Sequence, residues 1–212
     1  MKPAGTIAAQ PIETGHRRLS RSRMRTDRLF AVFLVVVELL AGGMASARGQ
    51  SPPTEYEIKA AFLYNFAKFV EWPADAFSDS RAPIVVGIVG EDPFGASLDA
   101  MVFGKSVNGR GLVVKRVSEG PELRSCHILF IGSSHQKHLA RILEILKDSG
   151  VLSVGEADRF TTSGGAIRFV LDENKVRFEI NLDATGRARL KLSAKLLALA
   201  RRVIADGLRG KN

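Results

Sequence analysis

Apolar side chains recur at spacings of three and four in the first strongly patterned stretch, EYEIKAAFLYNFAKFVEWP, which predicts an amphipathic helix. A capping box at Thr54 and Glu57 marks the start of this helix, and Pro73 ends it near Trp72. We expect its aromatic stripe to pack in a core rather than to line a ligand pocket. The residues on this face are Ile58, Phe62, Asn65, Phe66 and Phe69.

Farther along the chain, short apolar runs rich in β-branched residues alternate with helical patterns. This alternation is typical of a parallel sheet whose crossover helices cover its faces. Strands are predicted at residues 83–89, 111–117, 126–131 and 151–154, with helices at residues 94–102 and 136–148.

The end of the chain follows a different pattern. AIRFVL and KVRFEIN alternate apolar with polar side chains around a turn at residues 172–174, so they predict an antiparallel hairpin. RARLKLSAKLLALARRV then places Leu192, Leu196, Leu199 and Val203 on one helical face, with basic residues opposite. Such a helix either covers the sheet or lies on a membrane surface, and we favour the covering helix. The predicted fold class is α/β, a single three-layer Rossmann-like domain with a mixed, mostly parallel sheet and a C-terminal antiparallel hairpin.

The first 47 residues are typical of an export signal. A run of arginines leads into an apolar core at residues 29–40, and an A-x-A cleavage pattern follows at residues 45–47. The core is shorter than the roughly 20 residues that span a membrane, and Glu38 interrupts it. Translation starts either at Met1 or, for a signal of more ordinary length, at Met24.

Cleavage of the signal at residues 1–47 leaves a mature chain with three expected parts and a lower net charge. We expect residues 48–54 to form a flexible lead-in, residues 55–205 the folded domain and residues 206–212 a flexible tail. Without the signal the chain has 24 basic and 19 acidic side chains, so its net charge falls from +9 to +5. This modest charge has no basic block, which argues against a nucleic-acid partner, and no direct membrane insertion is expected after cleavage.

Cys126 is the only cysteine of the chain, so an exported protein has no internal disulfide to form. It lies in the apolar run CHILFIG, where a free cysteine behaves as a small hydrophobe. We therefore expect an inert thiol in the core rather than a nucleophile. His127 lies in the same predicted strand and is interpreted as half-buried and hydrogen-bonded rather than as a base.

Two strand-to-helix turns carry the candidate ligand-binding residues. VGIVGEDPFGAS resembles a phosphate loop, because Gly90 and Gly95 let backbone N–H groups turn inward, but Ala96 stands where such a loop needs lysine. We interpret this turn as a tight bend kept for shape, with binding of a small anion at the helix N-terminus as the alternative. In IGSSHQKH, Ser133 and Ser134 either cap the next helix or contact a ligand.

His135 and His138 are spaced so that both could hold one metal ion on a helix. No carboxylate or cysteine joins them locally, so neither a metal site nor a cofactor is predicted. The chain also lacks a nucleophile, a base and an orienting group in register, which predicts a protein that is not an enzyme.

The polar segment VGEADRFTTSGGAI links a predicted parallel strand to the hairpin. Gly164 and Gly165 permit positive φ there, and Glu156, Arg159 and Phe160 are expected to project outward as candidate partner-binding residues. For Phe160 the alternative is that its ring covers the hairpin.

Taken in order, several of these segments resemble the YfiR family of periplasmic proteins. The resemblance spans residues 56–200 and rests on EYEIKAAFLYNFAKFVEWP, VGIVGEDPFG, GKSVNGR, CHILFIG, the Gly164-Gly165 pair and NKVRFEINLDATGRARLKLSAKLLALA. The residues that match the family signature, which we interpret as structural, include Lys59, Phe62, Asn65, Phe66, Trp72, Pro73 and Asn181.

The resemblance implies regulation without catalysis. It implies a periplasmic homodimer that binds the periplasmic sensory part of an inner-membrane diguanylate cyclase of the YfiN type. Such a protein represses cyclic di-GMP synthesis and so controls biofilm formation and motility. The family also implies control by disulfide formation, but this chain has no second cysteine to pair with Cys126. The alternative interpretation is a periplasmic module that binds a small anion or nucleotide fragment at residues 90–95 or 133–134.

Overall fold

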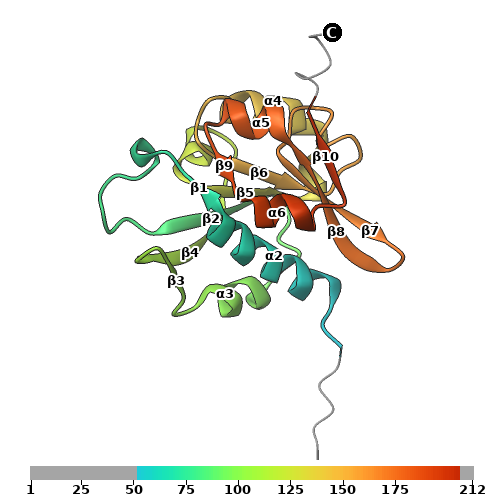
Figure 1. The fold of residues 1–212 in the computed structure, drawn as a ribbon, viewed down its shortest axis with the longest axis horizontal. Helices are drawn as coiled ribbons and strands as arrows, with labels where there is room; N and C mark the ends of the chain where they lie inside the picture. Colours follow the sequence, from blue (N-terminus) through green and yellow to red (C-terminus); the bar gives the residue numbers. More distant parts are fainter. Residues whose placement is uncertain (1–51, 206–212) are drawn as a thin grey trace, which may run out of the picture. The chain divides into compact units, whose positions relative to one another are not determined.

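The computed structural model describes residues 52–205, which are drawn in colour in Figure 1. The predicted export signal, most of the lead-in and the tail at residues 206–212 lie outside the described residues. The described helices are α2 (Glu55–Phe69), α3 (Ala96–Val102), α4 (Leu139–Leu146), α5 (Leu182–Arg187) and α6 (Ala194–Leu199), with 3-10 turns at Ala74–Ala76, Pro121–Ser125 and Ser133–His138.

One eight-stranded sheet orders the fold. Its strands are β2 (Ile84–Val89), β3 (Ser106–Val107), β4 (Arg110–Val117), β5 (Ile128–Ile131), β6 (Leu152–Gly155), β7 (Ile167–Asp172), β8 (Lys175–Asn181) and β10 (Arg202–Ile204). They lie in the order β10-β8-β7-β6-β5-β2-β4-β3. From β7 to β4 all neighbours are parallel, whereas β8 and β3 pair antiparallel with β7 and β4. The predicted α/β class with a mixed, mostly parallel sheet is therefore confirmed.

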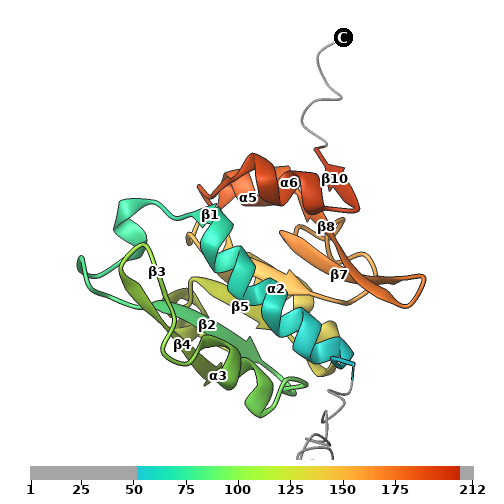
Figure 2. The same cartoon turned by 60° about the horizontal axis from the view of Figure 1, so that its bottom comes forward.

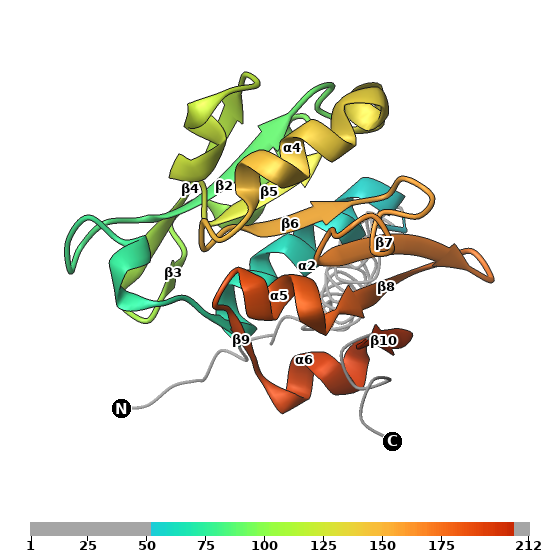
Figure 3. The same ribbon diagram turned by 90° about the horizontal axis from the view of Figure 1, so that it is seen from above.

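The central strands are buried on both faces, and this burial produces three layers. In β2 the side chains of Val86 and Ile88 enter one core with α2, α3 and α6, while Val85 and Val89 enter a second core with α4. Figure 2 shows α2 crossing one face of the sheet, and Figure 3 shows α4 lying on the other. Burial on both faces explains why these strands are continuously apolar rather than alternating.

The start of α2 has the predicted capping box. The Thr54 hydroxyl accepts a hydrogen bond from the Glu57 N–H, and the Glu57 carboxylate accepts one from the Thr54 N–H. The helix ends earlier than predicted, because the chain turns into β1 (Val70–Glu71), which pairs with β9 (Lys191–Leu192). The buried stripe is also displaced by about one residue from the predicted face. Its members are Lys59, Ala60, Leu63, Phe66 and Ala67, whereas Ile58, Phe62, Asn65 and Phe69 are half-buried.

The single long helix predicted near the C-terminus is wrong. Arg189 adopts φ +55° and interrupts it, and the Ser193 hydroxyl caps a new short helix, α6, by accepting from the Leu196 N–H. The chain then forms β10, which pairs with β8, so an open sheet edge outweighs local helix propensity. Of the predicted face only Leu196 is fully buried, while Leu199 and Val203 are exposed. No helix within residues 52–205 has the length and apolarity that a membrane crossing needs.

The predicted hairpin is confirmed as β7 and β8. Their register runs up to Asp172, which lies opposite Lys175, so the turn contains only Glu173 and Asn174. Both residues have positive φ, +49° and +59°, as a two-residue type I′ turn requires. The turn is therefore one residue shorter than predicted.

Phe160 is fully buried, which corrects the expectation that its ring projects outward. The ring fills the space between Gly155 and Gly165 so closely that a Cβ would lie only 2.4 Å from a ring carbon at Gly155 and 2.2 Å at Gly165. It belongs to the core beneath α4. None of the described residues grouped with it in that core belongs to β7 or β8, so the alternative, a ring that covers the hairpin, does not hold either.

Replacing Phe160 with alanine should leave a cavity that the two flanking glycines cannot fill. We expect Phe160→Ala to lower the free energy of unfolding by about 3–5 kcal/mol, measured by urea denaturation. Phe103→Ala is the matched control because its ring is 87% exposed, and its stability should stay within about 0.5 kcal/mol of wild type. Equal losses in the two variants would contradict this packing.

Candidate functional site at the carboxyl edge of the sheet

The connections that follow β2 and β5 leave the sheet on opposite faces. After β2 the chain enters α3 on the α2 face, and after β5 it enters α4 on the other face. In an open α/β sheet, ligands bind in the crevice outside the carboxyl ends of two such strands. Because β2 and β5 are neighbours, residues 90–95 and 132–138 meet at one place. We call these turns, with Glu119 after β4, the switch-point edge.

The two turns of the switch-point edge are hydrogen-bonded to each other. The Glu91 N–H donates to the Ser134 hydroxyl at 2.8 Å. Gly90 permits this close approach, because a Cβ there would lie 2.7 Å from Ser134 Oγ and 2.5 Å from His135 Nδ1. Gly90 also has φ +94°, which favours glycine. These contacts agree with the interpretation of the 90–95 turn as a bend kept for shape.

Neither candidate serine caps a helix, contrary to one interpretation of the sequence. Residues Ser133–His138 form a 3-10 turn that follows Gly132, and α4 begins only at Leu139. Ser133 is exposed, and the Ser134 hydroxyl accepts a hydrogen bond from the N–H of Glu91 in the neighbouring turn. The helix predicted at residues 136–148 is shorter for the same reason.

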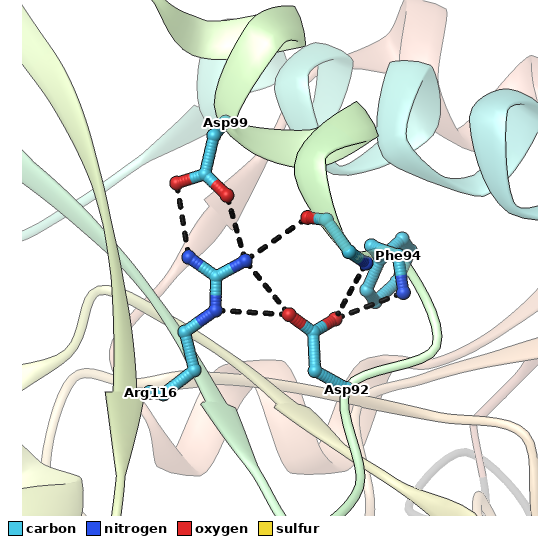
Figure 4. Close-up of polar contacts among 5 residues, drawn as sticks. Asp92, Phe94, Asp99 and Arg116 are labelled. Carbon is cyan, nitrogen blue, oxygen red and sulfur yellow. Dashed lines mark hydrogen bonds and ion pairs between the residues drawn. The ribbon is translucent and has the colours of Figure 1, made fainter.

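Arg116, on β4, braces the 90–95 turn through Asp92, as Figure 4 shows. The Arg116 guanidinium donates two hydrogen bonds to Asp92 and two to Asp99, at 2.7–2.9 Å. It also donates to the Gly95 carbonyl at 3.0 Å. The hydrogen bonds from Arg116 lower the pKa of Asp99. One cation shared by two carboxylates therefore fixes the turn and the start of α3 on the end of β4.

This bracing argues against the anion site considered for the same turn. The N–H groups of Phe94 and Gly95, which a bound phosphate would need, already donate to Asp92 at 2.8 and 3.2 Å. The Asp92 carboxylate also adds negative charge there. The structure therefore gives residues 90–95 no support as a site for a small anion or nucleotide fragment.

Glu119, His135 and His138 form a third group at the switch-point edge. One carboxylate oxygen of Glu119 contacts Nδ1 of His138 and lies 3.3 Å from Nε2 of His135. The side chains of Glu119 and His135 are 20% and 27% exposed, and that of His138 is 57% exposed. No carboxylate is near the two histidines in sequence, but the parallel sheet brings the ends of β4 and β5 to the same edge. The topology therefore supplies the acidic partner that local spacing lacked.

A buried polar group ties α2 to the loop that follows β6. Lys59 is 3% exposed, and its ammonium group pairs with Glu55 and with Glu156. The Tyr56 hydroxyl donates to Glu156 at 3.2 Å. Burial alone would lower the pKa of Lys59, but the hydrogen bonds to Glu156 and Glu55 outweigh it and raise the pKa. Lys59 is therefore charged at neutral pH and anchors the helix.

The three predicted partner-binding residues lie in three different environments. Arg159 is exposed on the β6–β7 loop and has φ +64°. The Glu156 carboxylate is bonded to Lys59 and Tyr56, so reversing its charge would disturb the anchoring of α2. Phe160 lies in the core. Of the three, only Arg159 offers an accessible side chain.

Other residues of the family signature make structural contacts. Asn181 caps α5 by accepting from the Ala184 N–H, and its amide donates to the Thr161 carbonyl. The Trp72 indole N–H donates to the His127 carbonyl at 3.2 Å. Pro73 precedes the 3-10 turn at Ala74–Ala76.

Cys126 and His127 lie before β5, at the opposite end of the strand from the switch-point edge. His127 is buried more deeply than predicted, at 6% exposed, and its Nδ1 accepts from the Val85 N–H. Burial lowers the pKa of His127 and raises that of the Cys126 thiol. Both residues are therefore uncharged at neutral pH, and the prediction of a core thiol is confirmed.

Comparison with known proteins identifies a family. A family model described as YfiR/HmsC-like matches residues 56–201. Among solved structures, a conserved domain protein from Vibrio cholerae O1 biovar eltor is 12% identical, with a TM-score of 0.47, over 73% of this chain and 62% of that chain. An ABC domain in complex with L-Trp from Streptococcus pneumonia is 10% identical, with a TM-score of 0.44, over 57% and 55%. This chain spans less than two thirds of either structure, and such weak likenesses carry no argument about function.

The ion pairs of Lys59 with Glu55 and Glu156 should contribute to the stability of the fold. Lys59→Met leaves Glu55 and Glu156 without their cationic partner, so we expect a loss of about 1–3 kcal/mol in the free energy of unfolding, measured by urea denaturation. Lys68→Met changes an exposed lysine of the same helix and should have an effect within about 0.5 kcal/mol. The same loss in both variants would show that the cluster does not anchor α2.

The contribution of the Arg116–Asp99 pair to stability should depend on pH. The folded-state pKa of Asp99 lies below its ordinary value of 3.8, so the pair stabilises the fold above about pH 4 and loses this contribution as the pH falls further. Because the Asp99 side chain is 49% exposed, the contribution is at most about 1 kcal/mol. The stability difference between wild type and Arg116→Leu should therefore shrink from neutral pH to about pH 3. A difference that is independent of pH would mean that Arg116 acts only through packing.

Proposed function

Because this chain belongs to the YfiR/HmsC-like family, we propose that it binds the periplasmic part of an inner-membrane diguanylate cyclase and represses cyclic di-GMP synthesis. Members of the family are periplasmic regulators of cyclic di-GMP signalling, and this chain shares that general role. The observation that carries the proposal is the match over residues 56–201, which includes nearly all the described residues. Control of biofilm formation and motility follows from the same proposal.

The proposed mechanism needs binding but no chemistry by this protein. A repressor only has to bind the inactive state of its partner more tightly than the active state. A difference of about 1.4 kcal/mol between the two affinities shifts that equilibrium tenfold. A modest interface is therefore sufficient, and the proposed role is non-catalytic.

We propose the β6–β7 loop as part of the surface that contacts the cyclase. Its first residue, Glu156, is held by Lys59, and Phe160 anchors its middle in the core. Between these anchors Asp158 pairs with Arg168, and Arg159 is exposed. A loop held at several points loses little conformational entropy when a partner binds. Arg159 is therefore the residue that we expect to contact the cyclase.

Export by residues 1–47 and assembly into a homodimer complete the proposal. The family supports a periplasmic location, and the basic and apolar pattern before residue 47 supports export. The homodimer rests on the family resemblance alone.

The partner surface is tested with a charge reversal. Arg159→Glu should weaken binding to the purified periplasmic part of the cyclase at least about tenfold while leaving the thermal midpoint unchanged. In cells, cyclic di-GMP should rise above the wild-type level, toward that of a strain that lacks this gene. Arg141→Glu, an exposed reversal on α4, is the matched control and should repress like wild type.

Two outcomes separate the parts of this proposal. If folded Arg159→Glu protein still represses fully, the surface is misplaced while the function stands. If deletion of the gene leaves cyclic di-GMP unchanged and the exported protein does not bind the cyclase, the proposed function itself is wrong.

A further inference from the structure

We propose that Glu119, His135 and His138 form a binding site for a first-row transition-metal ion, with Zn²⁺ as the ion to test. The three residues come from two separate turns of the switch-point edge, and their ligand atoms all lie within 4.8 Å of one another. This inference goes beyond the proposed regulatory function and does not depend on it. It also departs from the expectation of no metal site, which rested on the absence of a carboxylate or cysteine close to the two histidines in sequence.

The ligand set determines the class of ion. Two imidazole nitrogens and one carboxylate oxygen are typical of Zn²⁺ and its neighbours in the first transition row. Mg²⁺ and Ca²⁺ prefer oxygen ligands alone, so the two histidines argue against them. Three protein ligands leave a fourth tetrahedral position for water or for a side chain of another protein.

The distances suit a small ion. Ligand atoms bound at about 2.0–2.1 Å in a tetrahedron lie roughly 3.3 Å apart, and His135 Nε2 lies 3.3 Å from Glu119 Oε1. His138 contacts the same carboxylate directly, and its ring is 57% exposed. A rotation of this exposed side chain therefore makes room for an ion without a change in the core.

The surroundings of His135 hold its ring with Nε2 facing Glu119. The other ring nitrogen, Nδ1, lies 3.2 Å from Ser134 Oγ, and that hydroxyl also accepts from the Glu91 N–H. Metal-binding histidines commonly have such a second hydrogen bond, which fixes the ring and its tautomer. Gly90 is required here as well, because a Cβ at that position would collide with Nδ1. The two turns thus orient the ligand before any ion binds.

The same contacts have a second explanation, in which the cluster is only a hydrogen-bonded brace. In that case the Ser134 hydroxyl donates to Nδ1 of His135, and Nε2–H donates to Glu119. With an ion, Nδ1–H donates to Ser134 and the Nε2 lone pair faces the metal. The two explanations therefore differ in tautomer and in ion content, and both can be measured.

The test is Zn²⁺ binding by the purified protein after treatment with a chelator and removal of any polyhistidine tag. Titration calorimetry is expected to show one ion per chain. At about 100 times the dissociation constant, Zn²⁺ should raise the thermal midpoint by roughly 5–10 °C. X-ray absorption at the zinc edge should find two imidazoles and one carboxylate oxygen around the ion.

Three variants locate the ion. His138→Ala removes an exposed ligand and Glu119→Gln removes the charge of another, so each should weaken Zn²⁺ binding at least about 100-fold, more than loss of a supporting hydrogen bond typically does. Lys137→Ala, an exposed neighbour on the same turn, is the matched control and should bind like wild type. No binding by the wild-type protein, or equal affinity in folded His138→Ala or Glu119→Gln protein, would overturn the proposal. These measurements use the isolated protein, so their outcome is independent of the repression test.

Discussion

Burial of the central strands on both faces is the constraint on which the rest of this structure depends. Strands such as β2 and β5 are covered by α2 on one face and α4 on the other, so their side chains must be apolar. In these doubly covered strands, charged residues are left to the strand ends and the turns that follow them. Since β4, β2, β5 and β6 are parallel, their carboxyl ends meet at one edge. Residues that are distant in sequence, such as Asp92, Glu119 and Glu156, therefore gather there.

The charges at this edge are arranged mainly to hold the turns in shape. Arg116 is shared by Asp92 and Asp99, and Lys59 is shared by Glu55 and Glu156. In the Arg116 group, Asp92 already accepts hydrogen bonds from the N–H groups that an anion would need. Glu119 and its two histidines instead offer ligand atoms to a cation. Charge and hydrogen bonding thus point away from phosphate chemistry, and a phosphate-like turn in the sequence is a poor guide to the ligand.

The parts of the fold that the sequence predicts well are those with a local cause. Two-sided burial leaves continuously apolar runs, a capping box lies within four residues, and a two-residue hairpin turn joins alternating strands. The C-terminal helix was predicted wrongly because its leucines keep a helical spacing, while the pairing of β10 with β8 depends on a distant strand. Phe160 was misplaced because Gly155 and Gly165 enclose its ring only after folding. Glu119 was missed because only the sheet brings it to the histidines.

The topology also places the two proposed sites next to each other, in the connections that follow the neighbouring strands β5 and β6. His135 and His138 follow β5, and the loop with Arg159 follows its neighbour β6. Phe160, which anchors that loop, shares the core beneath α4 with Leu139, the residue directly after His138. An ion at the turn before α4 would reach the partner loop only if the packing of this shared core differed between the ion-bound and ion-free states. Such coupling requires different partner affinities for the ion-bound and ion-free states, and by linkage the partner would change the affinity for the ion by the same factor.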